Sequence, residues 1–263
     1  MAAEGRGQIR SVILVGTSGW QYRDWKERFY PAGLPQRGWL EFFSRRFPTV
    51  EVNNSFYRLP TEEVFVRWKE ASAPGFVVAV KASRYITHIR RLREAGDAVE
   101  LFWSRTRKLG SKLGPVLFQL PPRFGADIEL LRSFLRTLPS TMRAAFEFRD
   151  PSWDAPEVLE ALDRASAALV LADRPGWRVP STVTGGWSYI RFHQGRTLAP
   201  GYTRDKLRRW TERIAGLDAS DVYVYFNNDT GGAAVRDAAI LIDLLEDAGL
   251  DVARRPEEHA ARG

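Results

Sequence analysis

"VEVNNSFYRLP", residues 50–60, is the stretch of sequence from which the fold can be argued. Val50 to Asn53 alternate as a short strand does, because side chains i and i+2 share one face of a strand. Glu51 and Asn53 therefore lie on one face and Val50 and Val52 on the other. A buried carboxylate beside an amide is costly unless both groups have partners. The segment predicts a strand whose polar face points into a site that other strands help to build.

Seven further runs share this composition of Val, Ile, Phe and Tyr, which is typical of strands. With the first run, they cover residues 12–16, 50–53, 76–81, 115–119, 144–148, 168–171, 187–193 and 222–227. Amphipathic helical patterns lie between most of them, at 38–47, 61–71, 98–110, 126–138, 154–167, 203–217 and 231–249. We expect Thr61 and Asp154 to cap two of these helices and Gly110 to end a third.

Strands that alternate with helices imply βαβ units and a parallel sheet. Eight strands in 263 residues fit an α/β fold of one (β/α)8 TIM-type barrel. Residues 174–186, "RPGWRVPSTVTGG", predict a loop in place of the sixth helix. A doubly wound open sheet is the alternative. We expect a single domain over residues 1–263, with a core from about 12 to 250 and short polar tails at both ends.

Polar side chains gather at the C-terminal ends of the β-rich runs, and this end of a TIM-type barrel carries the active site. The charged candidates for catalysis are Glu51, Lys81, Glu147, Arg191 and His193. The candidates for substrate binding are Trp20, Tyr22, Asn53, Tyr57, His88, Gln119, Arg149, Trp153, Asn227 and Asn228. The alternative is a buried structural network, in which Glu51 pairs with Lys81 or Arg191 only to satisfy charge.

Composition narrows the function classes. The chain has no Cys, so disulfides, thiolate metal sites and Cys nucleophiles are excluded. Its net charge is +7 and its pI about 9.8, which favours anionic partners, although dispersed surface arginines explain this charge equally well. No apolar run is long enough to span a membrane, and the N-terminus lacks the apolar core of a signal peptide. We expect a cytoplasmic protein.

The motifs "GTSGWQYRDW" (16–25), "FYP" (29–31), "VEVNNSFYRLP" (50–60), "FVVAVKASRYITH" (76–88), "GPVLFQLPPRF" (114–124), "FEFRDPSW" (146–153), "YIRFHQG" (189–195) and "YFNND" (225–229) occur in this order. In these motifs the chain resembles the YecE-like family, domain of unknown function seventy-two, over nearly its whole length. The resemblance implies a TIM-type barrel and no particular reaction. One departure is Gln194, which separates His193 from Gly195 where the family has His-Gly directly.

The leading hypothesis is an enzyme, a hydrolase, lyase or isomerase, that binds an anionic phosphate-bearing or sugar-like small molecule. Glu51 and Glu147 would act as general base and general acid, provided that their surroundings separate their pKa values. Lys81, Arg191 and His193 would stabilise negative charge. A glycosidase would use the same two carboxylates.

No cofactor is predicted, but metal-assisted hydrolysis or isomerisation by a divalent ion is a second hypothesis. Its ligands would be Glu51, Glu147, Asp173 and His193, because carboxylates suit Mg²⁺ and Mn²⁺. Only three His residues are present, and no His-x-x-x-His motif occurs.

Nucleic-acid binding is a third hypothesis, through "RYITHIRRLR" (84–93), which we expect to be a basic, aromatic loop near the mouth. "NNDTGG" (227–232) could hold a phosphate at the start of the last helix, or simply cap that helix through Asp229 or Thr230. "GTSG" (16–19) is not a nucleophile elbow, and no Walker loop or dinucleotide-binding glycine motif occurs.

Overall fold

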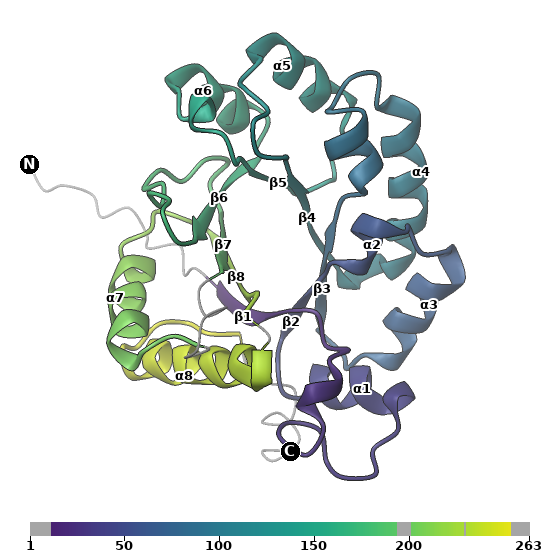
Figure 1. The fold of residues 1–263 in the computed structure, drawn as a ribbon, viewed down its shortest axis with the longest axis vertical. Helices are drawn as coiled ribbons and strands as arrows, with labels where there is room; N and C mark the ends of the chain where they lie inside the picture. Colours follow the sequence, from purple (N-terminus) through teal and green to yellow (C-terminus); the bar gives the residue numbers. More distant parts are fainter. Residues whose placement is uncertain (1–11, 194–200, 229, 254–263) are drawn as a thin grey trace, which may run out of the picture.

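The eight β-rich runs form eight parallel strands that close on themselves (Figure 1). The computed structural model describes residues 12–193, 201–228 and 230–253. Each strand pairs with the next along the chain, and β8 also pairs with β1. The strands are β1 Val12–Ser18, β2 Thr49–Val52, β3 Val77–Lys81, β4 Leu113–Gln119, β5 Ala144–Glu147, β6 Ala168–Asp173, β7 Ser188–Phe192 and β8 Asp221–Phe226. The predicted barrel is confirmed, and the doubly wound open sheet is wrong.

Helices surround the barrel (Figure 1). They are α1 Trp39–Ser44, α2 Asn54–Tyr57, α3 Glu62–Ala71, α4 Gly96–Thr106, α5 Ile128–Thr137, α6 Pro156–Arg164, α7 Arg204–Ala215 and α8 Ala233–Asp247. Shorter helical turns are η1 Arg23–Trp25, η2 Gln36–Gly38, η3 Tyr85–Ile89, η4 Arg107–Lys112, η5 Pro151–Trp153 and η6 Thr230–Gly232. Residues 174–187 between β6 and β7 contain no helix, so the predicted loss of the sixth helix is confirmed.

Two predicted helix ends are wrong. The N-cap of α6 is Ala155 rather than Asp154, because Pro156 begins the helix and holds the residue before it in an extended conformation. Gly110 does not end α4, which stops at Thr106 and is followed by η4; Gly110 lies inside that turn with φ 60° and ψ −129°.

Two other local expectations need correction. Thr61 is the N-cap residue of α3, as predicted, but its hydroxyl makes no capping hydrogen bond to the backbone. Residues 84–93, expected to be a loop, contain the π-helical turn η3. The predicted polar tails lie outside the described residues, as do the Gln194–Gly195 departure and the proposed cap Asp229.

The barrel interior is layered. Strand side chains that point outward join the helices in the main core, which includes Val15, Val50 and Phe146. Inward-pointing side chains form a second, smaller apolar cluster of Leu14, Ala79, Leu117, Ala145, Ala168, Val170, Ala172, Trp187, Tyr189, Tyr223 and Tyr225. Glu51, Glu147 and Arg191 continue this inward face toward the C-terminal ends of the strands, and all three are at most 1% exposed. These three side chains therefore form a polar layer above the apolar cluster. We call Glu51, Glu147 and Arg191 the polar layer.

Gly16 allows two strands to approach closely within this interior. A Cβ atom at Gly16 would lie 2.0 Å from the backbone oxygen of Thr49, far inside van der Waals contact. The Thr49 hydroxyl in turn lies 2.7 Å from the hydroxyl of Tyr225 on β8. Gly16 thus sets the spacing between β1 and β2 directly below the polar layer.

None of the helices in the described ranges is both long enough and apolar enough to cross a bilayer.

Candidate functional site

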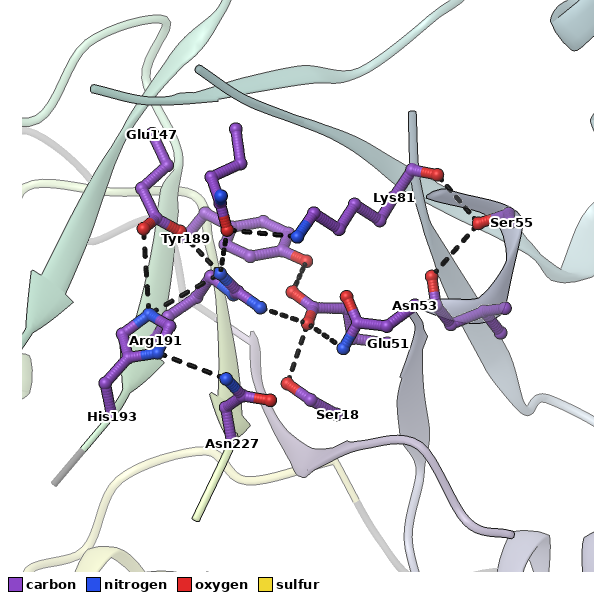
Figure 2. A network of polar contacts seen from close by, with 12 residues as sticks. Ser18, Glu51, Asn53, Ser55, Lys81, Glu147, Tyr189, Arg191, His193 and Asn227 are labelled. Atoms are coloured by element: carbon purple, nitrogen blue, oxygen red, sulfur yellow. Dashed lines mark hydrogen bonds and ion pairs between the residues drawn. The ribbon is translucent and has the colours of Figure 1, made fainter. Parts of the chain in front are cut away.

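Arg191 on β7 lies at the centre of the polar layer (Figure 2). Its Nη2 donates to Oε1 of Glu51 at 2.8 Å, and its Nη1 donates to Oε2 of Glu147 at 2.5 Å. Nη1 also lies 3.3 Å from Oε1 of Gln119 and 3.4 Å from Nε2 of His193. One guanidinium thus joins side chains from β2, β4 and β5, which brings the two predicted carboxylates together as expected.

Glu51 on β2 is fully buried and has all of its close partners within the barrel. Its Oε1 accepts hydrogen bonds from Ser18 at 2.7 Å and from Asn53 at 3.1 Å, besides that from Arg191. Its Oε2 accepts from the Tyr189 hydroxyl at 2.6 Å. Burial alone would raise the pKa of Glu51, but the charge of Arg191 and these hydrogen bonds outweigh burial and hold the pKa below its usual value.

Glu147 on β5 is held in a similar way. Its Oε1 accepts from Nε of Arg149 at 2.8 Å and lies 3.7 Å from Nε2 of His193. Burial opposes the ionised form, but the charge of Arg191 and the contact with His193 hold the pKa of Glu147 well below its usual value. The condition for an acid/base pair, that one of the two carboxyl groups has a raised pKa, is not met, because both pKa values shift downward. Neither carboxylate is suited to be a general acid near neutral pH.

Lys81 at the end of β3 has a different environment. Its Nζ donates to Oε1 of Gln119 at 3.0 Å and lies 4.2 Å from the ring centre of Phe56. Burial, followed by the positive charge of Arg191, lowers the pKa of Lys81 to about 8. Near neutral pH, Lys81 can therefore gain and lose a proton far more easily than an ordinary lysine.

Two histidines, His193 and His88, lie near these charged side chains. His193 has its Nδ1 3.2 Å from Nδ2 of Asn227, and burial and the charge of Arg191 lower its pKa. His88, in η3, packs its ring edge-on against Phe56 with centroids 4.9 Å apart. Burial and then the charge of Lys81 lower the pKa of His88 to about 4. Both imidazoles are neutral at pH 7.

We call Glu51, Lys81, Gln119, Glu147, Arg149, Arg191 and His193 the mouth cluster. It contains three cations and two carboxylates, so its net charge is about +1 when Lys81 is protonated. Arg84, Arg91 and Arg149 act on His88 as further positive charges, and Arg174 interacts electrostatically with Arg149 and Glu147. The C-terminal end of the barrel is therefore rich in positive charge.

Two buried polar atoms next to the Arg191–Glu51 ion pair have no hydrogen-bond partner among the described residues. They are Oδ1 of Asn53, beside Glu51, and Nε of Arg191. Most buried polar atoms in proteins are paired with protein groups or ordered water. An acceptor and a donor thus stay open for another molecule in the polar layer.

Several predicted binding residues do not face the mouth. Trp20 is 4% exposed and packs edge-on against Trp68, so it belongs to the core. Asn228 is also buried and donates to Asp237 of α8 at 2.8 Å, which fixes β8 to that helix. Tyr57 is 76% exposed on α2 and lies outside the cluster.

Tyr22 contacts the site through its hydroxyl group, which donates to the backbone oxygen of Ser18 at 2.5 Å. Its ring packs on Trp25 instead of facing the mouth cluster. Trp153 stacks on Phe148 and donates to the backbone oxygen of Phe124 at 2.6 Å. Trp153 also lines a cavity of about 320 Å³ between residues 148–154, β6, α6 and residues 177–182.

Three residues that complete the site were not among the predicted site residues. Tyr189 and Ser18 both donate to Glu51, and Phe56 lies against Lys81. Tyr189 stands two residues before Arg191, so strand alternation already placed it on the same face. Ser18 is the last residue of β1, and this position at the C-terminal end of a strand could have indicated a site residue.

The residues proposed as metal ligands do not assemble. Asp173 accepts from Nε1 of Trp210 at 3.0 Å and pairs with Lys206, so it is directed toward α7. Glu51 and Glu147 are already engaged by Arg191. Among the described residues, no group of three or more His, Asp or Glu side chains is arranged to hold a metal ion.

The glycine-rich start of α8 also differs from the expected phosphate site. The backbone N–H of Gly231 donates to Oδ2 of Asp24 at 2.8 Å, so a carboxylate of the protein already occupies that amide. The residue that caps α8 is Gly232, with φ 77°, and not Thr230.

The family described as "Protein of unknown function DUF72" matches residues 14–261. The chain belongs to the DUF72 family. Among curated relatives, this DUF72 chain is 27% identical to UPF0759 protein YunF of Bacillus subtilis (strain 168), over 89% of the chain and 95% of that protein. It is 32% identical over 145 residues to UPF0759 protein YecE of Escherichia coli (strain K12), a match that covers 55% of the chain and about half of that protein, 51%.

A solved structure has the same architecture as this DUF72 chain. The DUF72 family protein TM1631 of Thermotoga maritima MSB8 aligns with a TM-score of 0.80 and 28% identity, over 89% of the chain and 99% of that structure. The family resemblance stated from the motifs is thereby confirmed.

Proposed function

We propose that this DUF72 protein is an enzyme that binds a small anionic molecule at the C-terminal end of the barrel, above Arg191. The supporting observation is the charge of the mouth cluster, in which Arg191 is shared by two ionised carboxylates while Lys81 has no carboxylate of the described residues within ion-pair distance. Arg149 extends the positive region beside Lys81, because both side chains donate to Oε1 of Gln119. A phosphate or carboxylate group would restore neutrality there.

The proposed chemistry is proton transfer by nitrogen bases. Glu51 and Glu147 stay ionised, so their role is to orient Arg191 rather than to donate protons. His193 is neutral and partly accessible, with 11% of its side chain exposed, so it can accept a proton. Lys81 can donate or accept one near neutral pH. This arrangement favours a lyase or isomerase over a glycosidase, which needs a protonated carboxyl group.

Anion binding is tested by thermal shift and calorimetry with inorganic phosphate, sulfate, phosphorylated sugars and small dicarboxylates. At least one phosphorylated or carboxylated compound should stabilise the native protein, and Arg149→Gln should lose most of this shift. Arg143→Gln is the matched control, because Arg143 directly precedes the opposite end of β5 and pairs with Asp221 at 2.7 Å. A shift of equal size in both variants, or none in the native protein, would contradict the proposal.

Nucleic-acid binding is a second candidate, supported by exposed apolar side chains on the rim. Tyr57 is 76% exposed, and Tyr85 and Ile89 of η3 are 47% and 58% exposed, close in sequence to Arg84 and Arg91. Exposed aromatics beside arginines suit stacked bases and phosphates. A fluorescence titration with single-stranded oligonucleotides should show binding that weakens with salt and with Tyr85→Ala. No binding at low salt would remove this candidate.

A further inference from the structure

Lys81 differs from the other lysines whose Nζ contacts the structure gives. Lys206 pairs with Asp173 at 3.0 Å, and Lys108 pairs with Glu62 at 2.9 Å. Lys112 donates to the backbone oxygens of Lys69 and Ser72 far from the mouth. Among these four, only Lys81 donates to a neutral side-chain amide, that of Gln119, and its Nζ also lies over the ring of Phe56. These two contacts stabilise an ammonium ion less than a carboxylate partner at hydrogen-bond distance would.

The position of Lys81 relative to Arg149 sets the size of a molecule that could contact both. Lys81 Nζ is 3.0 Å and Arg149 Nη2 is 3.1 Å from the same atom, Oε1 of Gln119. The two nitrogens are thus at most the sum of these contacts, about 6 Å, apart. An anionic group at Arg149 would place an atom two or three bonds away beside the Lys81 amine.

We propose that Lys81 forms a covalent imine with the aldehyde or ketone carbon of a short anionic substrate, such as a 2-oxo acid or a phosphorylated hydroxyketone. The inference rests on the proposed anion-binding function and names its substrate class. Lys81 is partly exposed, pairs with no carboxylate among the described residues, and lies beside Arg149, the cation that would hold the anionic end. An amine kept partly neutral in a cationic site is a known route to an active lysine nucleophile.

The reaction balances without an oxidant or a reductant. The nitrogen lone pair forms a C–N bond while the carbonyl π electrons move to oxygen, which takes a proton from the nitrogen. The nitrogen of this carbinolamine then expels the hydroxyl group, which leaves as water after taking up one further proton. A protonated imine is formed, and it withdraws electrons from the neighbouring carbon, where neutral His193 could remove a proton.

Trapping with a reductant tests the proposal on the native protein. Glyoxylate, pyruvate and dihydroxyacetone phosphate are each added with sodium cyanoborohydride at pH 7, and peptide masses locate the reduced adducts. The chain has six lysines, at positions 26, 69, 81, 108, 112 and 206. A pKa of about 8 in place of 10.5 gives about 300-fold more free amine at pH 7, partly offset by lower nucleophilicity. Lys81 should therefore be labelled at least about tenfold faster than Lys108 by one of the probes.

Variants separate this inference from the proposed function. Lys81→Arg keeps the positive charge but cannot form an imine, so selective labelling should vanish while the anion-induced thermal shift persists. Lys108→Arg should leave labelling of Lys81 unchanged.

Equal, slow labelling of all lysines would overturn the imine. An anion-induced thermal shift that is lost in Arg149→Gln would then still support anion binding. Selective labelling without any anion shift would contradict anion binding but keep the nucleophilic lysine. Because the sites are mapped on the native protein, the test holds even if Lys81→Arg fails to fold.

Discussion

Glu51 and Arg191 form an ion pair of 2.8 Å inside the barrel, and neither side chain is more than 1% exposed. Such a pair contributes little net stability, because desolvation of both ions offsets their attraction. Removal of one partner is costly, since the other charge then remains buried alone. Arg191 compensates Glu147 as well, so the arrangement depends on Arg191 more than on either carboxylate.

Arg191→Met should lower the free energy of unfolding at pH 7 by about 3–5 kcal/mol, because buried Glu51 loses its ion-pair partner and Glu147 keeps only Arg149. Without Arg191, burial should raise the pKa of Glu51 above the unfolded value, so Glu51 takes up a proton in the folded state as the pH falls. The deficit relative to the native protein should therefore shrink between pH 7 and pH 5. Urea denaturation at both pH values measures this.

Arg143→Met is the control for that experiment. Arg143 pairs with Asp221, but its side chain is 37% exposed, so its loss should cost no more than about 1 kcal/mol. Equal deficits for the two variants, or a deficit that does not change with pH, would mean that Glu51 and Glu147 are not held ionised by Arg191.

Tyr189→Phe should lower the free energy of unfolding by about 1–3 kcal/mol, because Oε2 of Glu51 would lose its hydroxyl donor in a buried place. The ring stays and continues to pack against Tyr225. Tyr223→Phe is matched to it, since the Tyr223 hydroxyl lies 3.0 Å from the partly exposed Arg143 and water can replace it. Denaturation at pH 7 should show a clearly larger loss at Tyr189, and equal losses would contradict the buried acceptor.

Much of the fold was predictable because barrel strands carry a strong local signal. Val50 to Asn53 alternate, and a run such as residues 168–171 is apolar because β6 is buried on both faces. The absence of a helix at residues 174–186 was predictable from the Pro and Gly residues of that segment. Helix ends were less predictable, since at Ala155 the backbone restriction imposed by Pro156 decided the cap instead of the carboxylate of Asp154.

The central part of the site was predictable for the same reason. Strand alternation and the C-terminal position select Glu51, Glu147 and Arg191 without knowledge of their partners. The protonation states were not predictable, because they depend on distances between strands that are remote in sequence, such as the 2.5 Å contact of Arg191 with Glu147. The prediction that Trp20 belongs to the binding site was wrong for a related reason. A tryptophan packs in a core as readily as it stacks on a ligand, and sequence does not distinguish the two.

Lys81→Met should increase the free energy of unfolding at pH 7 by about 1–3 kcal/mol, because a folded pKa of about 8 lies below the unfolded value of about 10.4. Between these values the unfolded chain binds more protons, so the stability of the native protein rises with pH. Below pH 8 the native protein bears the full cost of the buried ammonium. Glu51, Glu147, Arg149 and Arg191 all act electrostatically on Lys81. Glu51 and Glu147 stay ionised and Arg191 stays protonated over this window.

The difference between Lys81→Met and the native protein, measured by denaturation from pH 7 to pH 9.5, isolates Lys81. It should be largest at pH 7 and shrink as the pH rises. Lys108→Met, whose side chain is 40% exposed, should show almost no difference at any pH. A loss of stability in Lys81→Met at pH 7 would mean that the ammonium is well paired, which would also weaken the case for a nucleophilic amine.

Gly16→Ala should be more damaging than Gly114→Ala, although both positions lie in barrel strands. The new methyl group at Gly16 would lie 2.0 Å from the backbone oxygen of Thr49, which can move only if β1 and β2 separate. At Gly114 the nearest atom, 2.5 Å away, is Cγ1 of Val77, a side-chain atom that a change of rotamer can move. We expect the free energy of unfolding to fall by more than about 3 kcal/mol in Gly16→Ala and by about 1–2 kcal/mol in Gly114→Ala, measured by denaturation at pH 7.

Separation of β1 and β2 would also shift Ser18 relative to Glu51, so Gly16→Ala should reduce anion binding, whereas Gly114→Ala should leave it unchanged. Similar losses in the two variants would show that β1 can move away from β2, and that the polar layer tolerates this movement.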